Sequence, residues 1–415
     1  MWPQIAPISS LLSGVALLLL GNGLLNTLLT LKGAAEGYST TMLGLIMSGY
    51  FAGFFIGIWV GAPLVKRVGH IRAFAFCCAL AAISALLHIL IVHPWVWLLL
   101  RVLYGIALIS LYMVIESWLN ARASSENRGK IFALYMAVNL GALALGQQFL
   151  HFDTSLGFAL FAVAAIFIVS ALMPVTLTRQ MQPSLPETPS SNLRELFGIA
   201  PLALAASGLS GLSLSGFWGM APAYANLLGF DAGGVGLLMT ATILGGALLQ
   251  WPIGRFSDSH DRRWVMFWVV TLAVVAALAM ALAPAGKLLL GLFFLWGGLS
   301  FAIYPLGVAQ LIDQLHPDEI LAGSGSLLLV NGVGAACGPL LVGVLMEQFG
   351  AVALPLYFAT TLALLAGYTL YRLRHVSDLV SGDQAHFMPM LRTSPTVLEL
   401  MPDAPPQEHP ENTST

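Results

Sequence analysis

The sequence predicts an all-α integral membrane protein in which twelve transmembrane helices form two six-helix pseudo-repeats. Of its 415 residues, 58% are hydrophobic and only 9% are charged, whereas a soluble domain carries about 25% charged residues. Apolar runs of about 18 residues or more recur along the chain, and each is long enough to cross a hydrocarbon core of roughly 30 Å as a helix. The two halves of the chain also resemble each other at a constant offset in residue number.

Short polar segments divide the chain into twelve apolar spans. The first six are predicted near residues 8–31, 41–64, 73–92, 95–118, 131–150 and 156–177. The second six are predicted near residues 197–219, 233–254, 264–283, 288–311, 322–346 and 351–371.

These spans divide the chain into four regions. We expect an N-terminal six-helix bundle over 1–178, a linker over 179–195 and a C-terminal six-helix bundle over 196–374. The linker contains three prolines and a Ser/Thr cluster, which favour a flexible connection. Residues 375–415 are rich in Pro, Ser, Thr and acidic residues, and they are predicted to be a disordered cytoplasmic tail.

The basic residues predict the orientation, because cytoplasmic loops hold an excess of Lys and Arg. Of the 17 Lys and Arg residues, only Lys32 and Lys287 fall on one side, and Arg101 lies within a span. We therefore expect a multi-pass membrane protein with both termini in the cytoplasm. The other side receives Lys66, Arg67, Arg72, Arg122, Arg128, Lys130, Arg179, Arg194, Arg255, Arg262, Arg263, Arg372, Arg374 and Arg392.

The repeat appears when 192 is added to each residue number of the first half. Single glycine matches carry little information, but one constant offset across several helices is informative. Two similar units favour a binding site between them that opens to alternate sides of the membrane. The matched pairs include Gly53 with Gly245, Gly105 with Gly297, Tyr112 with Tyr304, Asn139 with Asn331, and Gly146 with Gly338.

Two loops occupy equivalent places in the two halves and carry a known signature. The loops run from Ala62 to Arg72 and from Gly254 to Arg263, and they resemble the G-x-L-x-D-R-x-G-R-R signature of the major facilitator superfamily. The second copy keeps Asp258 and an Arg pair, whereas the first has Lys66 in place of the Asp. The resemblance implies the fold of this superfamily and a transport function.

Further motifs refine this resemblance. The stretch from Arg101 to Gly105 is similar to the superfamily's R-x-x-Q-G element, with Tyr replacing Gln. The stretches around Glu116 and from Gln250 to Arg255 are similar to the YcaD-like branch of bacterial transporters. This resemblance implies a location in a bacterial inner membrane. The antiporter signature of the fifth span has Gly-Pro where this chain has Gly-Gln at Gly146, which disfavours a drug/proton antiporter.

Polar residues inside the spans are the candidates for substrate binding. An intramembrane charge such as Arg101 is costly and is therefore a functional hypothesis, although an Arg can also snorkel to the membrane surface. The resemblance implies a role for Arg101 in proton coupling. Each of the other polar residues could instead make an interhelical hydrogen bond. The predicted substrate-binding set is Asn22, Asn26, Arg101, Tyr112, Asn139, Trp218, Tyr304 and Asn331, with Tyr224 and Gln250 as weaker additions.

Charged residues near the cytoplasmic helix ends are the candidates for a gate. Glu116 lies about 22 Å along the helix axis from Arg101, so the two side chains cannot pair. We expect Glu116 to meet a basic residue and to form a gate, with a proton-carrying role as the alternative. The predicted gating set is Lys66, Arg67, Glu116, Arg128, Asp258, Arg262 and Asp313.

The sequence favours a secondary active transporter that moves a small molecule by alternating access with proton coupling, in the direction of either efflux or uptake. The alternative is a membrane sensor that binds a ligand without transporting it. A third hypothesis is a lipid-handling protein. The expected partners are the substrate, protons and the lipid bilayer. We expect the protein to be monomeric. The net charge of −2 disfavours nucleic-acid binding. Without phosphate-loop or protease motifs or metal-ligand spacings, we expect no enzyme activity, cofactor or metal.

Overall fold

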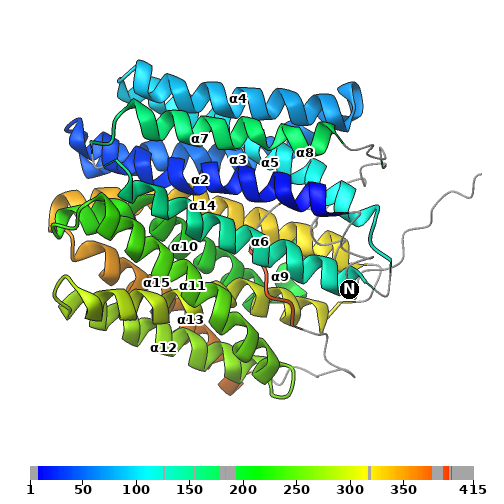
Figure 1. Cartoon of the computed structure of the whole chain (residues 1–415). Helices are drawn as coiled ribbons and strands as arrows, with labels where there is room; N and C mark the ends of the chain where they lie inside the picture. Colours follow the sequence, from blue (N-terminus) through cyan, green and yellow to red (C-terminus); the bar gives the residue numbers. More distant parts are fainter. Residues whose placement is uncertain are drawn as a thin grey trace, which may run out of the picture.

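The computed structural model describes residues 8–124, 127–153, 155–177, 183, 193–315, 319–375, 387–391 and 394. The described residues form helices and connecting segments without any strand, which confirms the predicted fold class. Eleven of the described helical segments are long and apolar enough to cross a membrane. Figure 1 shows the long helices lying side by side in a single bundle.

The first half begins with four long helices in short succession. The loops between them carry the expected helix signals: the Ser39 side chain accepts a hydrogen bond from the Met42 amide, and Pro94 occupies the first turn of its helix. The helices are α2 (Ser9–Ala35), α3 (Thr40–Val68), α4 (His70–Leu90) and α5 (Pro94–Asn120).

The last two spans of this half are less regular. Helix α6 (Arg128–Gln148) continues into a short 3-10 helix, η2 (Phe149–His151). The predicted span 156–177 consists of two pieces, α7 (Phe158–Ser170) and α8 (Leu172–Thr176). The interruption precedes Pro174, which cannot donate a backbone hydrogen bond to the preceding turn.

The second half repeats this series. Its first predicted span, 197–219, is corrected by the structure: a short helix, α9 (Leu193–Ile199), precedes α10 (Pro201–Leu227), because Pro201 starts a new helix. The remaining helices are α11 (Ala232–Ser257), α12 (Arg262–Leu282), α13 (Lys287–Ile312), α14 (Ile320–Phe349) and α15 (Ala353–His375).

Helix α10 is absent from the eleven membrane-spanning candidates. Its sequence contains Ser207, Ser210, Ser213 and Ser215, all buried, which lower its hydropathy. With 27 residues it is about 40 Å long at 1.5 Å per residue, which is enough to span a bilayer. We therefore count α10 as the twelfth span of the described part.

The helix boundaries follow the repeat. Adding 192 to the bounds of α2, 9–35, gives 201–227, which are the bounds of α10. The same operation on α4, 70–90, gives 262–282, the bounds of α12. The turns agree as well, since Gly37 and Gly229 have φ angles of 81° and 85°, values that glycine adopts without steric cost.

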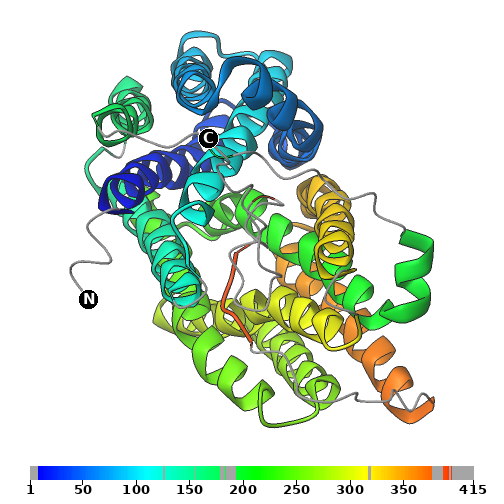
Figure 2. The same cartoon turned by 90° about the vertical axis from the view of Figure 1, so that its right-hand side faces the viewer.

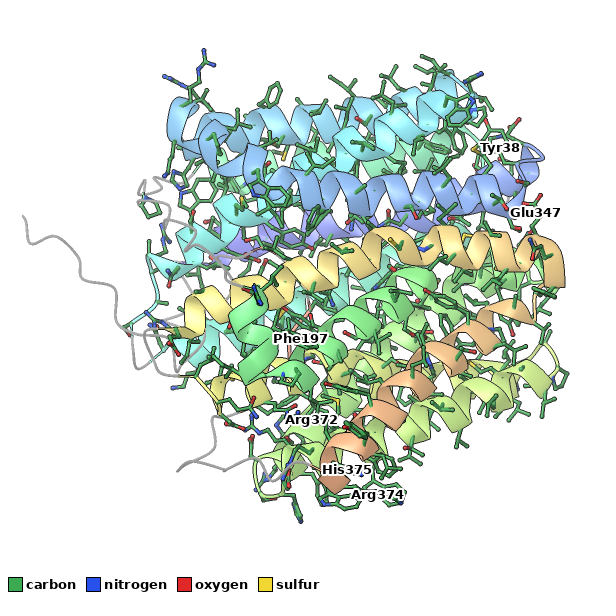
Figure 3. The ribbon with its side chains drawn as sticks, turned by 180° about the vertical axis from the view of Figure 1, so that it is seen from behind. Tyr38, Phe197, Glu347, Arg372, Arg374 and His375 are labelled. Atoms are coloured by element: carbon green, nitrogen blue, oxygen red, sulfur yellow. The ribbon has the colours of Figure 1, made fainter. Side chains whose placement is uncertain are left out.

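The two halves lie on either side of a central interface (Figure 2). We call the end of the bundle that carries the α3–α4, α5–α6, α11–α12 and α13–α14 connections the basic end, because Lys66, Arg128 and Arg262 lie there. The other end is called the opposite end. Figure 3 shows Tyr38 and Glu347 together at the opposite end.

The halves contact each other directly at the opposite end. The Thr40 hydroxyl donates to the Gly343 carbonyl over 2.9 Å, and the Thr41 amide donates to the Glu347 carboxylate over 3.0 Å. On the other flank, the Gln148 amide donates to the Thr240 hydroxyl over 2.5 Å. These contacts join α3 to α14 and α6 to α11, so this end of the molecule is closed.

Part of the tail predicted over 375–415 falls within the described residues: His375 ends α15, and residues 387–391 and 394 are also described. Phe387 and Met390 are only 7% and 2% exposed, and Ser394 is fully buried. This segment lies between the two halves toward the basic end, where Figure 2 shows it as a red strip at the centre. The rest of the predicted tail, and most of the predicted linker, fall outside the described residues.

Candidate functional site

A cavity lies between the two halves at about the middle of the helices. Its volume is about 130 Å³, which is below the roughly 300–1,000 Å³ of sites for drug-sized ligands. Most of its walls are aromatic or aliphatic, and none of the described residues that line it is Asp, Glu, Lys, Arg or His. The lining residues are Asn22, Asn26, Met47, Tyr50, Phe51, Phe54, Tyr112, Leu143, Gly211, Leu214, Ser215, Trp218, Phe301, Tyr304, Asn331, Ala335, Met390 and Leu391.

Most of the predicted substrate-binding residues meet at this cavity. Asn22, Asn26, Tyr112, Trp218, Tyr304 and Asn331 line it, and they come from both halves. Arg101 and Asn139 lie behind this lining and each contacts one of its members. The repeat contributes directly, because the matched pair Tyr112 and Tyr304 faces the cavity from opposite halves.

Arg101 is the centre of a buried polar cluster behind the cavity wall. Its guanidinium donates to the Asn26 side-chain oxygen over 2.6 Å, and its Cζ atom lies 4.4 Å from the centre of the Tyr50 ring. Tyr104 extends the cluster, since its hydroxyl donates to the Asn22 side-chain oxygen over 3.2 Å. The positive charge therefore lies one residue away from the cavity, held by an amide and an aromatic face.

Among the described residues no carboxylate forms an ion pair with Arg101. The side chain is fully buried, and its Nε and Nη1 atoms have no hydrogen-bond acceptor. A buried cation without a counter-ion is expensive. The cluster therefore places a positive charge beside the cavity without a neutralising carboxylate from the described residues, which distinguishes it from a structural ion pair.

The repeat-related residues Asn139 and Asn331 make different hydrogen bonds near the cavity. The Tyr112 hydroxyl donates to the Asn139 side-chain oxygen over 3.3 Å, and the Asn139 amide donates to the Tyr135 carbonyl over 2.8 Å. In the second half, the Asn331 amide donates to the Ser207 carbonyl over 2.8 Å. Asn139 thus positions a cavity residue, whereas Asn331 links α14 to α10 and also faces the cavity.

Sequence reasoning missed the aromatic residues of α3. Tyr50 and Phe54 are spaced by four residues, so they lie on one face of the helix, and that face lines the cavity together with Phe51. The spacing was a usable signal. It did not distinguish a cavity from lipid, because Trp59 on the same helix is 55% exposed on the outer surface.

The predicted gating residues of the second half form a compact cluster. The Arg262 guanidinium lies 3.3 Å from the Asp258 carboxylate and 3.3 Å from that of Asp313. Arg262 is only 3% exposed, whereas Asp258 is about one-third exposed. This cluster ties the end of α11 to the start of α12 and the end of α13.

Glu116 has partners other than the basic residues expected for it. It is fully buried, and its carboxylate accepts hydrogen bonds from the Tyr135 hydroxyl over 2.8 Å and from the Ser394 hydroxyl. Lys66 and Arg67 are exposed at the end of α3, and Arg128 is half-buried at the start of α6. The expected meeting of Glu116 with Lys66 or Arg67 stays a prediction.

The weaker candidates lie apart from the cavity lining. Tyr224 packs against Phe293, with ring centres 5.8 Å apart. Gln250 is fully buried, and neither its amide nitrogen nor its oxygen has a hydrogen-bond partner. Among the described residues, no group of three or more His, Cys, Asp or Glu side chains is gathered so that it could hold a metal ion.

Comparison with known proteins places this arrangement in a family. The sequence model of the Major Facilitator Superfamily matches the chain over residues 11–208 and again over 202–398. The chain belongs to the Major Facilitator Superfamily. This is a family of membrane transporters rather than enzymes, so the chain is a multi-pass transporter of that superfamily.

Within the superfamily the chain is similar to the YcaD-like transporters. It is 28% identical to the uncharacterized MFS-type transporter YcaD of Escherichia fergusonii, over 90% of this chain and 98% of that protein. It is 29% identical to the YcaD transporter of Escherichia coli over 83% of this chain and 90% of the relative. These values bear out the branch inferred from the residues around Glu116 and Trp251.

Solved structures of other superfamily members share the fold. A mutant of the nucleoside transporter NupG matches with a TM-score of 0.74 and 16% identity, over 87% of this chain and 98% of that one. A bacterial homologue of the human lysosomal transporter Spinster, in an inward-facing and occupied conformation, matches with a TM-score of 0.71 and 15% identity, over 89% and 96%. At such identities the likeness concerns the fold alone.

Proposed function

We propose that the chain is a secondary carrier that binds an uncharged, largely aromatic small molecule in the central cavity and moves it by alternating access. The observation that carries this proposal is the cavity between the two halves, with seven aromatic residues, Tyr50, Phe51, Phe54, Tyr112, Trp218, Phe301 and Tyr304, among its lining. Flat apolar surfaces of this kind bind planar ligands by stacking and by excluding water.

The polar groups of the lining indicate which hydrogen-bonding groups the substrate carries. The amides of Asn22, Asn26 and Asn331 can each donate and accept hydrogen bonds. A substrate that presents a few hydrogen-bonding groups at its edge meets these amides while its ring system lies among the aromatic side chains. Since no acidic or basic side chain is found among the described lining residues, a charged group at this position would be buried without a counter-ion from them.

We propose that the basic end faces the cytoplasm of a bacterial cell and that a proton gradient drives transport. The excess of Lys and Arg at the basic end supports this orientation. Among the described residues, Glu116 is the one buried carboxylate, which makes it the group whose protonation a gradient would change. It lies at the end of α5 that faces the proposed cytoplasmic side.

The test begins with a thermal-stability screen of the purified protein against neutral aromatic compounds and their charged analogues. A ligand that binds only the folded state raises the apparent melting temperature. We expect neutral compounds to stabilise the protein and Trp218→Ala to abolish the shift. Trp59→Ala, at an exposed position on α3, is the matched control. Stabilisation by charged analogues alone would contradict the proposed substrate class.

Transport itself is tested with the stabilising compound in proteoliposomes. We expect flux that rises with an imposed pH gradient and stops when a protonophore removes it. Specific binding without any flux, with or without a gradient, would contradict the carrier and would favour a membrane sensor. Flux that ignores the pH gradient would leave a carrier but would contradict proton coupling.

A further inference from the structure

The described residues of the C-terminal segment 387–394, which are 387–391 and Ser394, connect the two halves of the transporter at the basic end. The Phe387 amide donates to the Asp258 carboxylate over 2.8 Å, in the second half. The Ser394 hydroxyl donates to the Glu116 carboxylate, in the first half. The two carboxylates that the sequence assigns to the gates of separate halves are therefore both bound by the same short segment.

The surface beneath this segment is shaped for it. The Phe387 ring packs on Gly254, where a methyl group would overlap the ring atoms. On the first half, the Leu391 amide lies 3.4 Å from the Met136 sulfur atom. Phe387 and Met390 are buried. Apolar side chains in fitted positions, together with backbone bonds to fixed partners, are the features of peptide recognition rather than of incidental contact.

The segment also forms part of the cavity wall. Met390 and Leu391 line the cavity together with residues of both halves. The direct contacts at the opposite end, such as that between Thr40 and Gly343, close the cavity on the other side. The segment therefore lies on the route from the cavity to the basic end.

We propose that the space between the halves at the basic end is a peptide-binding site, that its occupant is the chain's own segment 387–394, and that occupancy blocks the exit of the cavity. The covalent connection makes this binding intramolecular. A tethered segment has an effective concentration on the order of millimolar, so modest contacts keep the site occupied. Entry of a substrate from the basic end requires release of the segment.

The proposal explains the small volume of the cavity. About 130 Å³ is too little for a ligand of drug size, and the removal of Met390 and Leu391 would open one wall. The proposal also defines the arrangement of the gate residues at the basic end. As long as Glu116 and Asp258 are bound to the segment, the two halves are bridged at this end and cannot approach each other directly.

The test compares two truncated proteins with the full chain. One ends after residue 381 and loses the whole segment, and its matched control ends after residue 396 and keeps it. Each protein carries a cysteine at the cavity residue Leu143, in a background where Cys337, the exposed native cysteine, is replaced by Ala. The readout is the rate of labelling by a membrane-impermeant maleimide applied from the basic end.

We expect labelling at least tenfold faster in the protein that ends after residue 381, and an unchanged rate in the one that ends after residue 396. A synthetic peptide of residues 384–396 at millimolar concentration should slow the fast labelling again. Equal rates in all three proteins would overturn the proposal, as would a peptide without effect. Because labelling requires no substrate, this outcome is independent of whether the proposed transport function holds.

A point substitution separates the segment from general effects of truncation. Phe387→Asp in the full chain places a carboxylate against Gly254 and beside Asp258, so we expect it to release the segment and to speed labelling as truncation does. Phe387→Leu, which keeps an apolar side chain over Gly254, is the matched control at the same position, and its labelling rate should stay near that of the full chain. Equal labelling rates for Phe387→Asp and the full chain would contradict the proposed site.

Discussion

At the scale of single residues, Arg101 is the most unusual feature of the molecule. It is a fully buried cation that is held by Asn26 and by the faces of Tyr50 and Tyr104. Its charge acts on the cavity through Asn26, which both accepts its hydrogen bond and lines the cavity. The sequence predicted Arg101 as functional because of its position in a span, but it did not predict this aromatic surrounding.

We predict that Arg101→Ala lowers transport at least tenfold while the protein remains folded. Arg101→Lys should also be impaired, because an ammonium lacks the planar surface that stacks on Tyr50. Flux of the stabilising ligand into proteoliposomes is the measurement, with circular dichroism and membrane yield as folding controls. The matched control is Arg255→Ala, since Arg255 lies 5.7 Å from the Trp251 ring on the exposed surface. Wild-type flux in Arg101→Ala would disprove the role of the cluster.

Asn139 offers a finer test, because it reaches the cavity only through the Tyr112 hydroxyl. We predict that Asn139→Ala and Tyr112→Phe each raise KM about threefold, since an interhelical hydrogen bond is worth about 0.6 kcal/mol in a membrane protein. The double variant should be no worse than either single one. Additive effects in this double-mutant cycle would show that the two residues act separately.

Part of the proposed substrate site was predictable at the residue scale, and one reason is the repeat. Pairs such as Tyr112 and Tyr304 were found because two copies of one helix face the same cavity from opposite halves. Arg101 and Asn139 belong to a second layer that spacing along one helix cannot distinguish from the first. Phe301 was missed because its partner in the repeat is Ile109, so no matched pair marks it.

At the scale of helices, close crossings explain where glycine is required. A methyl group on Gly105 of α5 would overlap the Tyr50 carbonyl of α3, and one on Gly53 of α3 would overlap the Val102 carbonyl. The repeat reproduces this crossing, because Gly245 and Gly297 occupy the same places in α11 and α13. Small residues allow the backbones of membrane helices to approach closely.

We predict that Gly105→Ala destabilises the protein by about 1–3 kcal/mol, which is the usual cost of overpacking. The opposing atoms belong to backbone and cannot move aside. Thermal unfolding of the purified protein in detergent is the measurement. Gly141→Ala in α6, where no atom lies within 4 Å of the added methyl group, is the control and should be neutral. A stable Gly105→Ala protein would contradict the observed crossing of α3 and α5.

The helix boundaries show how far sequence reasoning reaches at this scale. Apolar runs predicted the existence and order of the helices, but α3 continues through Lys66 and Arg67 to Val68. A helix need not end where the hydrocarbon core ends, so hydropathy gives the span and not the helix. Local chemistry explains the other differences, since Pro174 interrupts the sixth span and Pro201 begins the seventh.

At the scale of the whole molecule, the structure shows one arrangement of the two halves. Direct contacts close the opposite end, and residues 387–391 and Ser394 lie between the halves at the basic end. The fold could be predicted because composition and the repeat act over hundreds of residues. The position of the segment could not be predicted from the sequence. The residues around it are rich in Pro and polar side chains, which is typical of disorder, and its partners Glu116 and Asp258 lie far away in the sequence.

Alternating access requires the opposite end to open during each cycle. The bonds of Thr40 with Gly343 and of Thr41 with Glu347 must therefore break and form again. We predict that holding α3 and α14 together at this place stops transport without affecting ligand binding. A cross-link between cysteines at Thr41 and Glu347 would do this, in a protein that carries Cys337→Ala.

The decisive measurement is flux through this double-cysteine protein before and after treatment with a short, reducible bifunctional thiol reagent. We predict that the cross-linked protein still shows the ligand-induced rise in melting temperature but loses flux in proteoliposomes, and that reduction restores the flux. Either single-cysteine protein treated in the same way should transport normally. Undiminished flux through the fully cross-linked protein would contradict an alternating-access carrier with its substrate site between the two halves.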